Sequence, residues 1–256
     1  MSDLNQLLEL TKSVARQAGE KLLKNNKANY KEYIHCSDLP KEIKAVADTE
    51  LEKEILKKLT PTGIPILSEE AGFVEGQADS KYMFIIDPLD GTFNFVKNLG
   101  PCAVSIALWQ DQKPIFGVIY NLIDKKLFWG GDAMGAYCDN QPISVSSTSS
   151  QVGASICTGF PVRYDVESDN SMQNFWNLVK PYAKVRMIGS AAVSLLNVAE
   201  GSADVYSEQS IMLWDVAAGI AIVQGAGGEV HFIPRSTEYA LDVFASNKLL
   251  IERHEI

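Results

Sequence analysis

The sequence predicts a layered fold that mixes helices and sheets, and three observations predict it. The chain begins with helical periodicity, its first half continues with short apolar segments between turns, and its second half alternates strand and helix patterns. Of the 256 residues, 46% are hydrophobic and 21% are charged, which is typical of a globular protein with a sizeable core. A Ser/Thr-rich connector at residues 144–150 marks the expected boundary between the two halves.

Two amphipathic helices are expected near the start of the chain. Apolar residues recur at helical spacing over residues 4–22, and a second such pattern covers residues 47–59. The Thr-Pro-Thr-Gly sequence at residues 60–63 ends the second helix. Between the helices, residues 25–40 are polar and predict a loop or a pair of strands.

Short strands follow in the first half. The apolar run at residues 83–86 predicts a buried strand, and Pro88 predicts that this strand ends at Asp87. Turn residues at 111–114 and 139–140 separate later apolar segments, so we expect an antiparallel meander. The expected strands are residues 64–67, 83–86, 102–108, 115–120, 126–129 and 136–138, whereas residues 72–80 are polar and expected to be mobile.

Strands and helices are expected to alternate in the second half. Apolar periodicity switches between the two patterns, with Gly-containing turns between them. The expected strands are residues 152–158, 185–188, 203–206 and 229–233, the expected helices are 171–182, 191–200 and 215–224, and residues 243–251 close the fold.

Charge and cysteine content narrow the function classes. The formal net charge is 23 − 32 = −9, which argues against nucleic-acid binding through a broad basic surface. A phosphorylated substrate stays compatible with this charge, because bound divalent cations reverse the local sign of a carboxylate cluster. Four cysteines, Cys36, Cys102, Cys138 and Cys157, form no C-x-x-C pair, and neither a signal peptide nor a membrane-spanning run is expected. These features predict a soluble cytoplasmic protein with reduced thiols.

Two aspartates at the end of the 83–86 strand form the first candidate site. Asp87 and Asp90 are separated by two residues, and Gly91 follows, where the lack of a side chain allows close backbone approach to a ligand. Two carboxylates beside free backbone N–H groups suit a hard cation bridged to a phosphate. The structural alternative is that Asp87 is a turn residue and Asp90 the N-cap of the following helix.

Other carboxylates lie at similar element ends. Glu69 and Glu70 follow the 64–67 strand, and Asp48 lies at the start of the second helix, where a surface pair and a helix cap are the alternatives. Asp215 precedes a segment that is apolar all round and therefore predicts a buried helix. A carboxylate at a buried helix start is costly unless a cation or hydrogen bonds compensate it, so a metal ligand is favoured there.

Other catalytic motifs are absent from the sequence. It contains no G-x-S-x-G elbow, H-E-x-x-H pair, phosphate-binding P-loop or G-x-G-x-x-G fingerprint. The histidines His35, His231 and His254 occupy a loop, a late strand and the C-terminal tail, and are expected to be structural. Of the catalytic types considered, only chemistry that depends on carboxylate side chains remains.

Five segments, in chain order, resemble motifs of the inositol monophosphatase family of Mg²⁺-dependent, lithium-sensitive phosphatases. Residues 87–95 (DPLDGTFNF) are similar to its first signature, and residues 214–219 (WDVAAG) with 225–228 (GAGG) to its second. Residues 67–70 (LSEE) resemble its metal-binding Glu-Glu element, and residues 189–204 its substrate-side segment. The resemblance implies a single domain over residues 1–256, folded as the α-β-α-β-α sandwich of inositol monophosphatases and fructose-1,6-bisphosphatases. Its metal-site half would be residues 1–145 and its substrate-side half residues 146–256.

The resemblance also implies the roles of individual residues. A small phosphorylated substrate would be hydrolysed by metal-activated water, with about two to three Mg²⁺ ions and no covalent intermediate. Thr92 with Glu70 or Asp48 would position and deprotonate the water. The implied metal ligands are Glu69, Asp87, Asp90, Asp215 and the Leu89 carbonyl, and the implied substrate contacts are Gly91, Thr92, Gly189, Ser190, Ala191 and Glu208.

Substrate choice stays open within the family. Residues 92–95 follow the inositol phosphatase pattern, whereas residues 59–70 and 198–201 are closer to the 3′(2′),5′-bisphosphate nucleotidase branch. We favour inositol monophosphate or a similar polyol phosphate, with the nucleotide as the alternative. Some bacterial members bind the transcription apparatus, so an interaction protein is a third hypothesis. Family analogy further implies a homodimer, and no nucleic-acid or membrane partner is expected.

Overall fold

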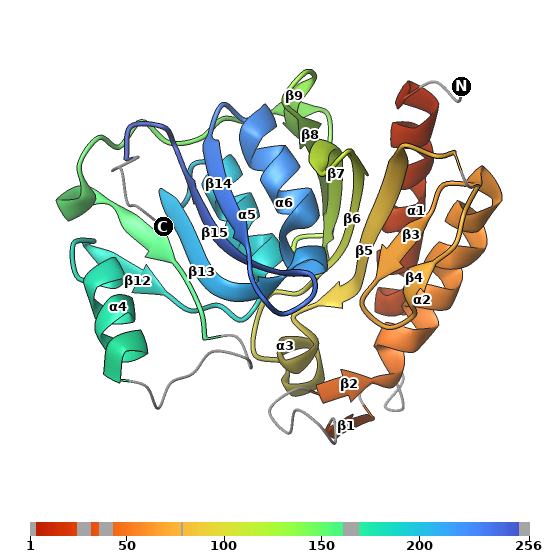
Figure 1. Ribbon diagram of the computed structural model, residues 1–256, viewed down its shortest axis with the longest axis horizontal. Coiled ribbons are helices and arrows are strands. Elements are labelled where there is room, and N and C mark those ends of the chain that lie inside the picture. The colour runs from red at the N-terminus through yellow and green to blue at the C-terminus, as the bar shows by residue number, and fades with distance from the viewer. Residues whose placement is uncertain (1–3, 25–31, 36–42, 78, 161–168, 251–256) are drawn as a thin grey trace.

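The computed structural model describes residues 4–24, 32–35, 43–77, 79–160 and 169–250. Its helices are α1 (Leu4–Lys24), α2 (Val46–Leu59), α3 (Thr92–Lys97), α4 (Asp169–Val179), α5 (Ala191–Ala199) and α6 (Leu213–Gly225). Figure 1 shows α1 and α2 on one face of a large sheet, α5 and α6 between that sheet and a smaller one, and α4 beyond the smaller sheet. The layers therefore follow the order α-β-α-β-α, which confirms the predicted fold class.

The larger sheet has eight strands in the order β10-β9-β8-β7-β6-β5-β3-β4. From β5 to β10, each strand pairs antiparallel with the next one in the chain, which confirms the predicted meander. The strands are β3 (Ile66–Ser68), β4 (Gly72–Val74), β5 (Tyr82–Asp90), β6 (Ala103–Gln110), β7 (Lys113–Asn121), β8 (Lys126–Gly131), β9 (Gly135–Cys138) and β10 (Gln141–Pro142). Separately, β1 (Tyr33–His35) pairs antiparallel with β2 (Ile43–Ala45).

Strand β5 is apolar on both faces because helices cover both faces of the sheet. Phe84 and Ile86 belong to the core beneath α1 and α2, whereas Ile85 belongs to the core shared with α5 and α6. Alternate side chains of a strand point to opposite faces, so a strand between two helical layers needs apolar residues at successive positions. The uninterrupted apolar run at residues 83–86 is therefore explained by the position of β5 between two helical layers.

The smaller sheet has the order β12-β11-β13-β15-β14. Strand β11 is parallel to both β12 and β13, and β15 is antiparallel to β13 and β14. The strands are β11 (Ser155–Cys157), β12 (Lys184–Arg186), β13 (Val205–Met212), β14 (Glu229–Pro234) and β15 (Ala240–Ser246).

Helix α6 lies at the centre of the molecule and is buried from Val216 to Val223. It packs so closely on β7 that a Cβ atom on Gly117 would lie 2.1 Å from the Ala218 carbonyl oxygen. Burial on all sides confirms the expectation from its apolar sequence. No helix in the described part of the chain is both long and apolar enough to cross a membrane.

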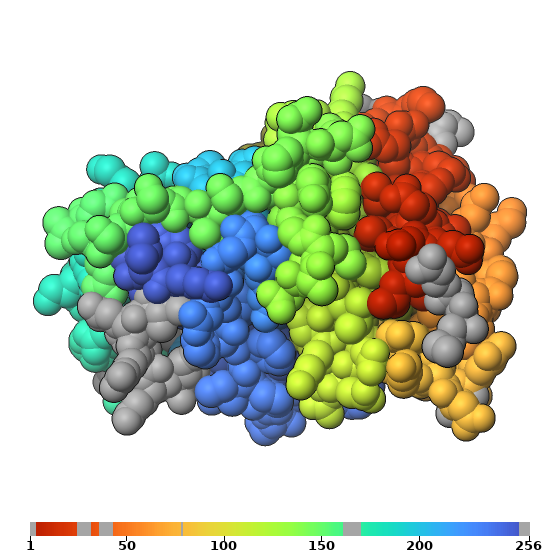
Figure 2. Space-filling view, turned by 90° about the horizontal axis from the view of Figure 1, so that it is seen from above, coloured from red at the N-terminus to blue at the C-terminus, as the bar shows by residue number. Residues whose placement is uncertain are grey.

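The connector at residues 144–150 has no regular secondary structure. In Figure 2 the green segment that contains it runs over the surface, from the hairpins of the larger sheet toward β11. Its contacts include Asp204, which accepts hydrogen bonds from Ser146 and Ser155 at 2.7 and 3.0 Å. The connector is thereby held against the strands of the second sheet.

Several predicted boundaries are wrong: β11 is shorter than the predicted 152–158 strand, α4 ends at Val179 instead of residue 182, and β7 begins at Lys113, inside the predicted turn. Three further differences reflect strand pairing. Strand β5 continues past Pro88 to Asp90, β13 continues to Met212, and β4 lies in the 72–80 segment that was expected to be mobile. In each case, pairing with a neighbouring strand extends the strand beyond its local apolar pattern. Cys36, His254 and residues 25–31, 36–42 and 251–256 lie outside the described residues.

Candidate metal centre and active site

A β-bulge brings Asp87 and Asp90 to the same side of β5. Asp87 pairs with Ser105 and Asp90 with Ala103, so two residues of β5 oppose one of β6. In a regular strand, side chains three positions apart would point to opposite faces. The extra residue cancels this difference, and Pro88, which has no N–H to donate, fits the irregular position.

Asp215 completes a cluster of three carboxylates with this pair. One carboxylate oxygen from each of Asp87, Asp90 and Asp215 lies within 4.8 Å of the others. Asp87 also contacts Glu69 and Asp215 through side-chain hydrogen bonds. The Glu69 oxygens lie outside the 4.8 Å group, although Glu69 itself is adjacent to it. The structure thus brings together the four carboxylates that the resemblance implied as metal ligands.

Asp90 is not the N-cap of the helix that follows it. That position is Gly91, which has a positive φ of 86°. The Asp90 carboxylate instead lies at the start of α5, where it accepts hydrogen bonds from the Ser190 hydroxyl and from the Ala191 and Ala192 N–H groups, the latter two at 3.2 and 3.1 Å. The positive end of a helix dipole stabilises a carboxylate there. Ser190 and Ala191 therefore position Asp90, and their direct contact with substrate stays a prediction.

Asp48 and Asp215 occupy equivalent positions in α2 and α6. Each is the third residue of its helix, and its Oδ2 atom accepts a hydrogen bond from the N–H three residues earlier, from Ala45 at 2.6 Å and from Met212 at 3.2 Å. Each carboxylate therefore caps its helix with one oxygen. The other oxygen is available to the site.

The free oxygen of Asp48 meets Thr92. The Thr92 hydroxyl lies 2.9 Å from Asp48 Oδ1 and 3.0 Å from the Leu89 carbonyl oxygen, and it can donate its one proton to either. Glu70, the other candidate for activating water, accepts a hydrogen bond from Lys44 at 2.7 Å. The two candidates for activating water therefore differ in their hydrogen-bond donors: Asp48 is bonded to neutral groups and Glu70 to a charged one.

Burial and mutual repulsion raise the pKa values of these carboxyl groups. Burial is the largest cause for all of them, and it raises the pKa of Asp48 to about 7, that of Asp90 to about 6 and that of Glu208 to about 7. The pKa values of Glu69, Asp87 and Asp215 are also well above their ordinary range, because each is buried and surrounded by like charges.

This set of donors fits Mg²⁺. The cluster offers oxygen atoms only, from buried carboxylates with the Leu89 carbonyl beside them, and hard divalent cations prefer such ligands. A bound dication would also offset the repulsion that raises the pKa values of the cluster.

Glu208 lies beside the carboxylate cluster, and two residues shape its surroundings. The Tyr206 hydroxyl donates to Glu208 Oε2 at 3.0 Å from a fully buried ring. Gly159 leaves room for the carboxylate, since a Cβ atom there would lie 2.7 Å from Glu208 Oε1. Glu208 is close enough to Asp90 and Asp215 to influence the ionisation of Asp215. It therefore borders the carboxylate cluster.

Asn94 links α3 to the turn that precedes α5. Its side-chain amide donates to the carbonyl oxygens of Ile188 at 2.6 Å and Pro101 at 2.9 Å, and it also contacts the Gly189 carbonyl oxygen. Gly189 has a φ of 71°, and a Cβ atom there would lie 3.1 Å from Asn94. The turn before α5 is thus fixed against α3.

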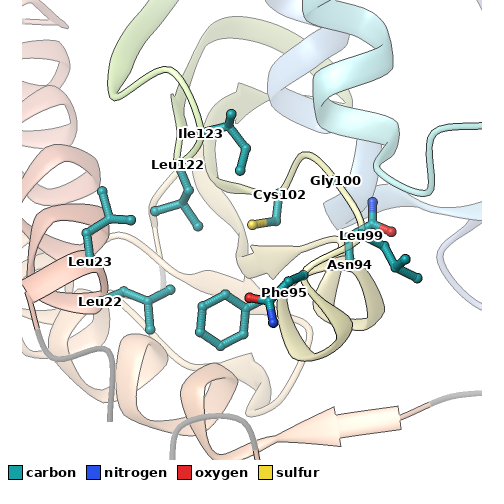
Figure 3. Close-up of a pocket in the computed structure, with 10 residues that line it drawn as sticks. Leu22, Leu23, Asn94, Phe95, Leu99, Gly100, Cys102, Leu122 and Ile123 are labelled. Carbon is teal, nitrogen blue, oxygen red and sulfur yellow. The ribbon is translucent and has the colours of Figure 1, made fainter. Parts of the chain in front are cut away.

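A separate cavity of about 400 Å³ lies beside α3, and it lacks the chemistry of the carboxylate site. In Figure 3, Leu22 and Leu23 of α1 face Phe95 of α3, with Leu122 and the Cys102 thiol above Phe95 in this view. Among the described residues, its lining carries no carboxylate and no cationic side chain. The cavity therefore does not fit a phosphorylated substrate.

Three residues of the site were missed at the level of sequence. Lys44, Asn94 and Tyr206 contact Glu70, Gly189 and Glu208, respectively, but none was a candidate. Asn94 lies inside the 87–95 motif, so its position was a usable signal. Tyr206 precedes Glu208 by two residues in a strand, which places both side chains on one face. No local pattern marks Lys44, because its partner lies 26 residues away.

Known proteins resemble this chain over nearly its whole length. The model of the inositol monophosphatase family matches residues 3–253. An inositol-1-monophosphatase from Synechocystis is 37% identical over 231 residues, which cover 90% of this chain and 79% of that protein. The Nus factor SuhB of Pasteurella multocida is 34% identical over 236 residues, which cover 89% of this chain and 85% of that protein.

Solved structures of similar proteins share the fold. The extragenic suppressor protein suhB from Bartonella henselae superposes with a TM-score of 0.84 at 30% identity, with 95% of each chain covered. The inositol monophosphatase from Anabaena gives a TM-score of 0.80 at 32% identity, and the match covers 95% of this chain and 91% of that one. Motifs, fold and overall similarity lead to one conclusion: the chain belongs to the inositol monophosphatase family.

Proposed function

We propose that this protein is a Mg²⁺-dependent phosphomonoesterase that hydrolyses inositol monophosphate or a similar polyol phosphate with an activated water molecule. The observation that carries the proposal is the convergence of Asp87, Asp90 and Asp215 within 4.8 Å, beside the hydrogen-bonded pair of Thr92 and Asp48. One part of this arrangement holds a hard cation, and the other can take a proton from water. Metal-assisted hydrolysis needs both.

The metal ligands in this proposal are Glu69, Asp87, Asp90, Asp215 and the Leu89 carbonyl. When bound, about two to three Mg²⁺ ions would neutralise phosphate charge and lower the pKa of water. The hydrogen bonds to Asp90 from α5 and to Asp215 from Met212 fix the orientation of these ligands before binding. By analogy with the family, we expect Li⁺ to inhibit the reaction.

Thr92 and Asp48 move the proton in this proposal. The Thr92 hydroxyl can accept a hydrogen bond from the attacking water while it donates its own proton to Asp48 Oδ1. A pKa near 7 suits Asp48 as a proton acceptor at neutral pH. Glu70 is the alternative proton acceptor, but its carboxylate already accepts a charge-assisted hydrogen bond from Lys44, which suits a positioning role better.

Substrate contacts complete the proposal. The backbone N–H groups of Gly91 and Thr92 at the start of α3 would bind phosphate oxygens, and Glu208 would accept a hydrogen bond from a substrate hydroxyl. The turn at Gly189, with Ser190 and Ala191, would border the substrate between these groups. Glu208 and its partner Tyr206 favour a substrate that carries hydroxyl groups near its phosphate.

The test is phosphate release from a panel of substrates with Mg²⁺, with a chelator and with added Li⁺. The panel contains inositol 1-phosphate, 3′-phosphoadenosine 5′-phosphate, fructose 1,6-bisphosphate and glycerol 2-phosphate. Chelator-sensitive preference for inositol 1-phosphate is the expected result. Preference for the nucleotide would instead support the bisphosphate nucleotidase alternative, and release from none of them would contradict a phosphatase.

A role in transcription is the second candidate, and the similarity to the Nus factor SuhB of Pasteurella multocida favours it. Co-purification of Nus factors with the wild-type chain, and equally with its Asp90→Asn variant, would support a binding role separate from catalysis. We further propose a cytoplasmic homodimer. Among the described residues, Cys102, Cys138 and Cys157 form no disulfide with one another, as is usual in a reducing compartment.

A further inference from the structure

Lys44 brings a positive charge into contact with the acidic site. Its ammonium nitrogen lies 2.7 Å from Glu70 Oε2, and the Glu70 side chain is only 11% exposed. A charge-assisted hydrogen bond of this length to a mostly buried carboxylate is stronger than an exposed ion pair. Lys44 lies in the middle of β2, opposite Ile34 of β1, so pairing between the strands fixes its backbone.

Glu70 belongs electrostatically to the metal cluster. Its charge contributes to the raised pKa values of both Asp48 and Glu69. Glu69 in turn contacts Asp87. A divalent cation bound near Glu69 would therefore also be attracted by the charge of Glu70, unless another cation already neutralised that charge.

The Asp48 carboxylate, in contrast to that of Glu70, has no cationic partner in the hydrogen bonds described. Asp48 accepts its hydrogen bonds from the Ala45 N–H and the Thr92 hydroxyl, which are neutral donors. Glu70 has the full positive charge of Lys44 at bonding distance. A charge of this kind cancels the attraction of Glu70 for a dication and also repels that dication directly.

We propose that the Lys44 ammonium takes the position of a divalent cation at Glu70, so that Glu70 orders the site without binding a metal ion. This inference rests on the proposed function, and it restricts where in the site the metal ions bind. Bound ions would be confined to the side of Glu69, Asp87, Asp90 and Asp215. Glu70 would be a positioning residue that holds the turn between β3 and β4 and orients water.

The experiment counts Mn²⁺ ions bound per chain, by calorimetric titration and electron paramagnetic resonance, without substrate. Lys44→Met removes the charge and keeps most of the side-chain length, so we expect it to bind one more Mn²⁺ than the wild type. Lys53→Met is the matched control, because it breaks an exposed pair with Glu50 on α2 and should leave the count unchanged. An unchanged or lower count in Lys44→Met would overturn the inference.

Glu70→Gln tests the same inference without changing Lys44. If Lys44 already satisfies Glu70, this variant binds as many Mn²⁺ ions as the wild type, and the double variant Lys44→Met/Glu70→Gln returns to the wild-type count. Loss of an ion in Glu70→Gln alone would overturn the inference. Absence of Mn²⁺ binding in the wild type would defeat the proposed function itself, so the two failures are distinguishable.

Discussion

The Thr92 hydroxyl lies 2.9 Å from Oδ1 of Asp48, although 44 positions separate the two residues in the chain. Thr92 is the first residue of α3, and Asp48 is fixed at the start of α2 by its bond to Ala45. The contact brings the starts of α2 and α3 together, so that a proton can pass from the Thr92 hydroxyl to Asp48. It supports the proposed role of this pair in activating water.

Removal of this hydroxyl should slow the chemical step. We expect Thr92→Val, which keeps the side-chain volume, to lower kcat by about 100-fold with little change in KM, because proton transfer is needed mainly in the transition state. Steady-state kinetics with inositol 1-phosphate check this. The control is Thr11→Val in α1, which removes a buried hydroxyl that donates to the Leu7 carbonyl oxygen and contacts no residue of the proposed site in the hydrogen bonds described. An effect confined to KM would refute the proton-transfer role.

Asp90→Asn should abolish metal-dependent turnover without unfolding the protein. It removes one ligand charge at constant volume, and we expect kcat/KM to fall by at least about 100-fold. The metal-free variant should stay folded, because reduced repulsion on Asp87 and Asp215 offsets the hydrogen bonds from α5 that an amide nitrogen cannot accept. Kinetics and thermal unfolding check both statements. Asp111→Asn, in the exposed β6–β7 turn, is the control, and near-wild-type kcat in Asp90→Asn at saturating Mg²⁺ would contradict the metal assignment.

Ser190→Ala should weaken both α5 and the metal centre. The Ser190 hydroxyl donates to Asp90 and accepts a hydrogen bond from the Val193 N–H. It therefore both orients a proposed metal ligand and caps the N-terminus of α5. We expect the free energy of unfolding to fall by about 1–2 kcal/mol and the apparent Kd for Mg²⁺ to rise. Denaturant titration and calorimetry measure the two effects. Ser194→Ala, which removes a hydroxyl inside the same helix, should leave Mg²⁺ binding unchanged, and equal effects from both variants would contradict the argument.

Tyr206→Phe should affect substrates according to their hydroxyl groups. Without the Tyr206 hydroxyl, Glu208 loses the donor that orients it, so kcat/KM for inositol 1-phosphate should fall by about tenfold. Hydrolysis of p-nitrophenyl phosphate, which has no hydroxyl for Glu208, should change little. Tyr120→Phe removes the hydroxyl of another buried tyrosine, in β7, and serves as the control. Equal losses on both substrates would show a general structural effect instead.

The metal-free protein should become less stable as pH rises. Asp48, Asp90 and Glu208 have pKa values of about 7, 6 and 7 when folded, against ordinary values of 3.8, 3.8 and 4.5. Between the two sets of values the folded state holds protons that the unfolded chain releases, so raising the pH favours unfolding. Above the folded pKa values this source of stability is fully lost.

Calorimetry in the presence of chelator should therefore give a lower Tm at about pH 8 than at about pH 5.5. Added Mg²⁺ should raise the Tm most at the higher pH, where the carboxylates are ionised and can bind it. The Asp90→Asn variant should show a weaker pH dependence. A Tm that rises with pH in the absence of metal would contradict the assigned direction.

The sequence by itself determined most elements and the family of the protein. Helix periodicity over residues 4–22 and 47–59 and the meander after β5 follow from short-range sterics and from the need to bury apolar side chains, which local patterns carry. The apolar run after Asp215 predicted the buried helix at the centre of the fold. Carboxylates at element ends, together with the family motifs, identified the residues that the structure then brings together.

The tertiary structure decided how these residues meet. The bulge that aligns Asp87 with Asp90 depends on pairing with β6, and the bonds that hold Asp90 come from α5, about 100 residues further along the chain. Lys44 meets Glu70 only because β2 lies beside the turn after β3. Such contacts depend on the packing of elements that are remote in sequence. No periodicity or motif within a single segment encodes that packing.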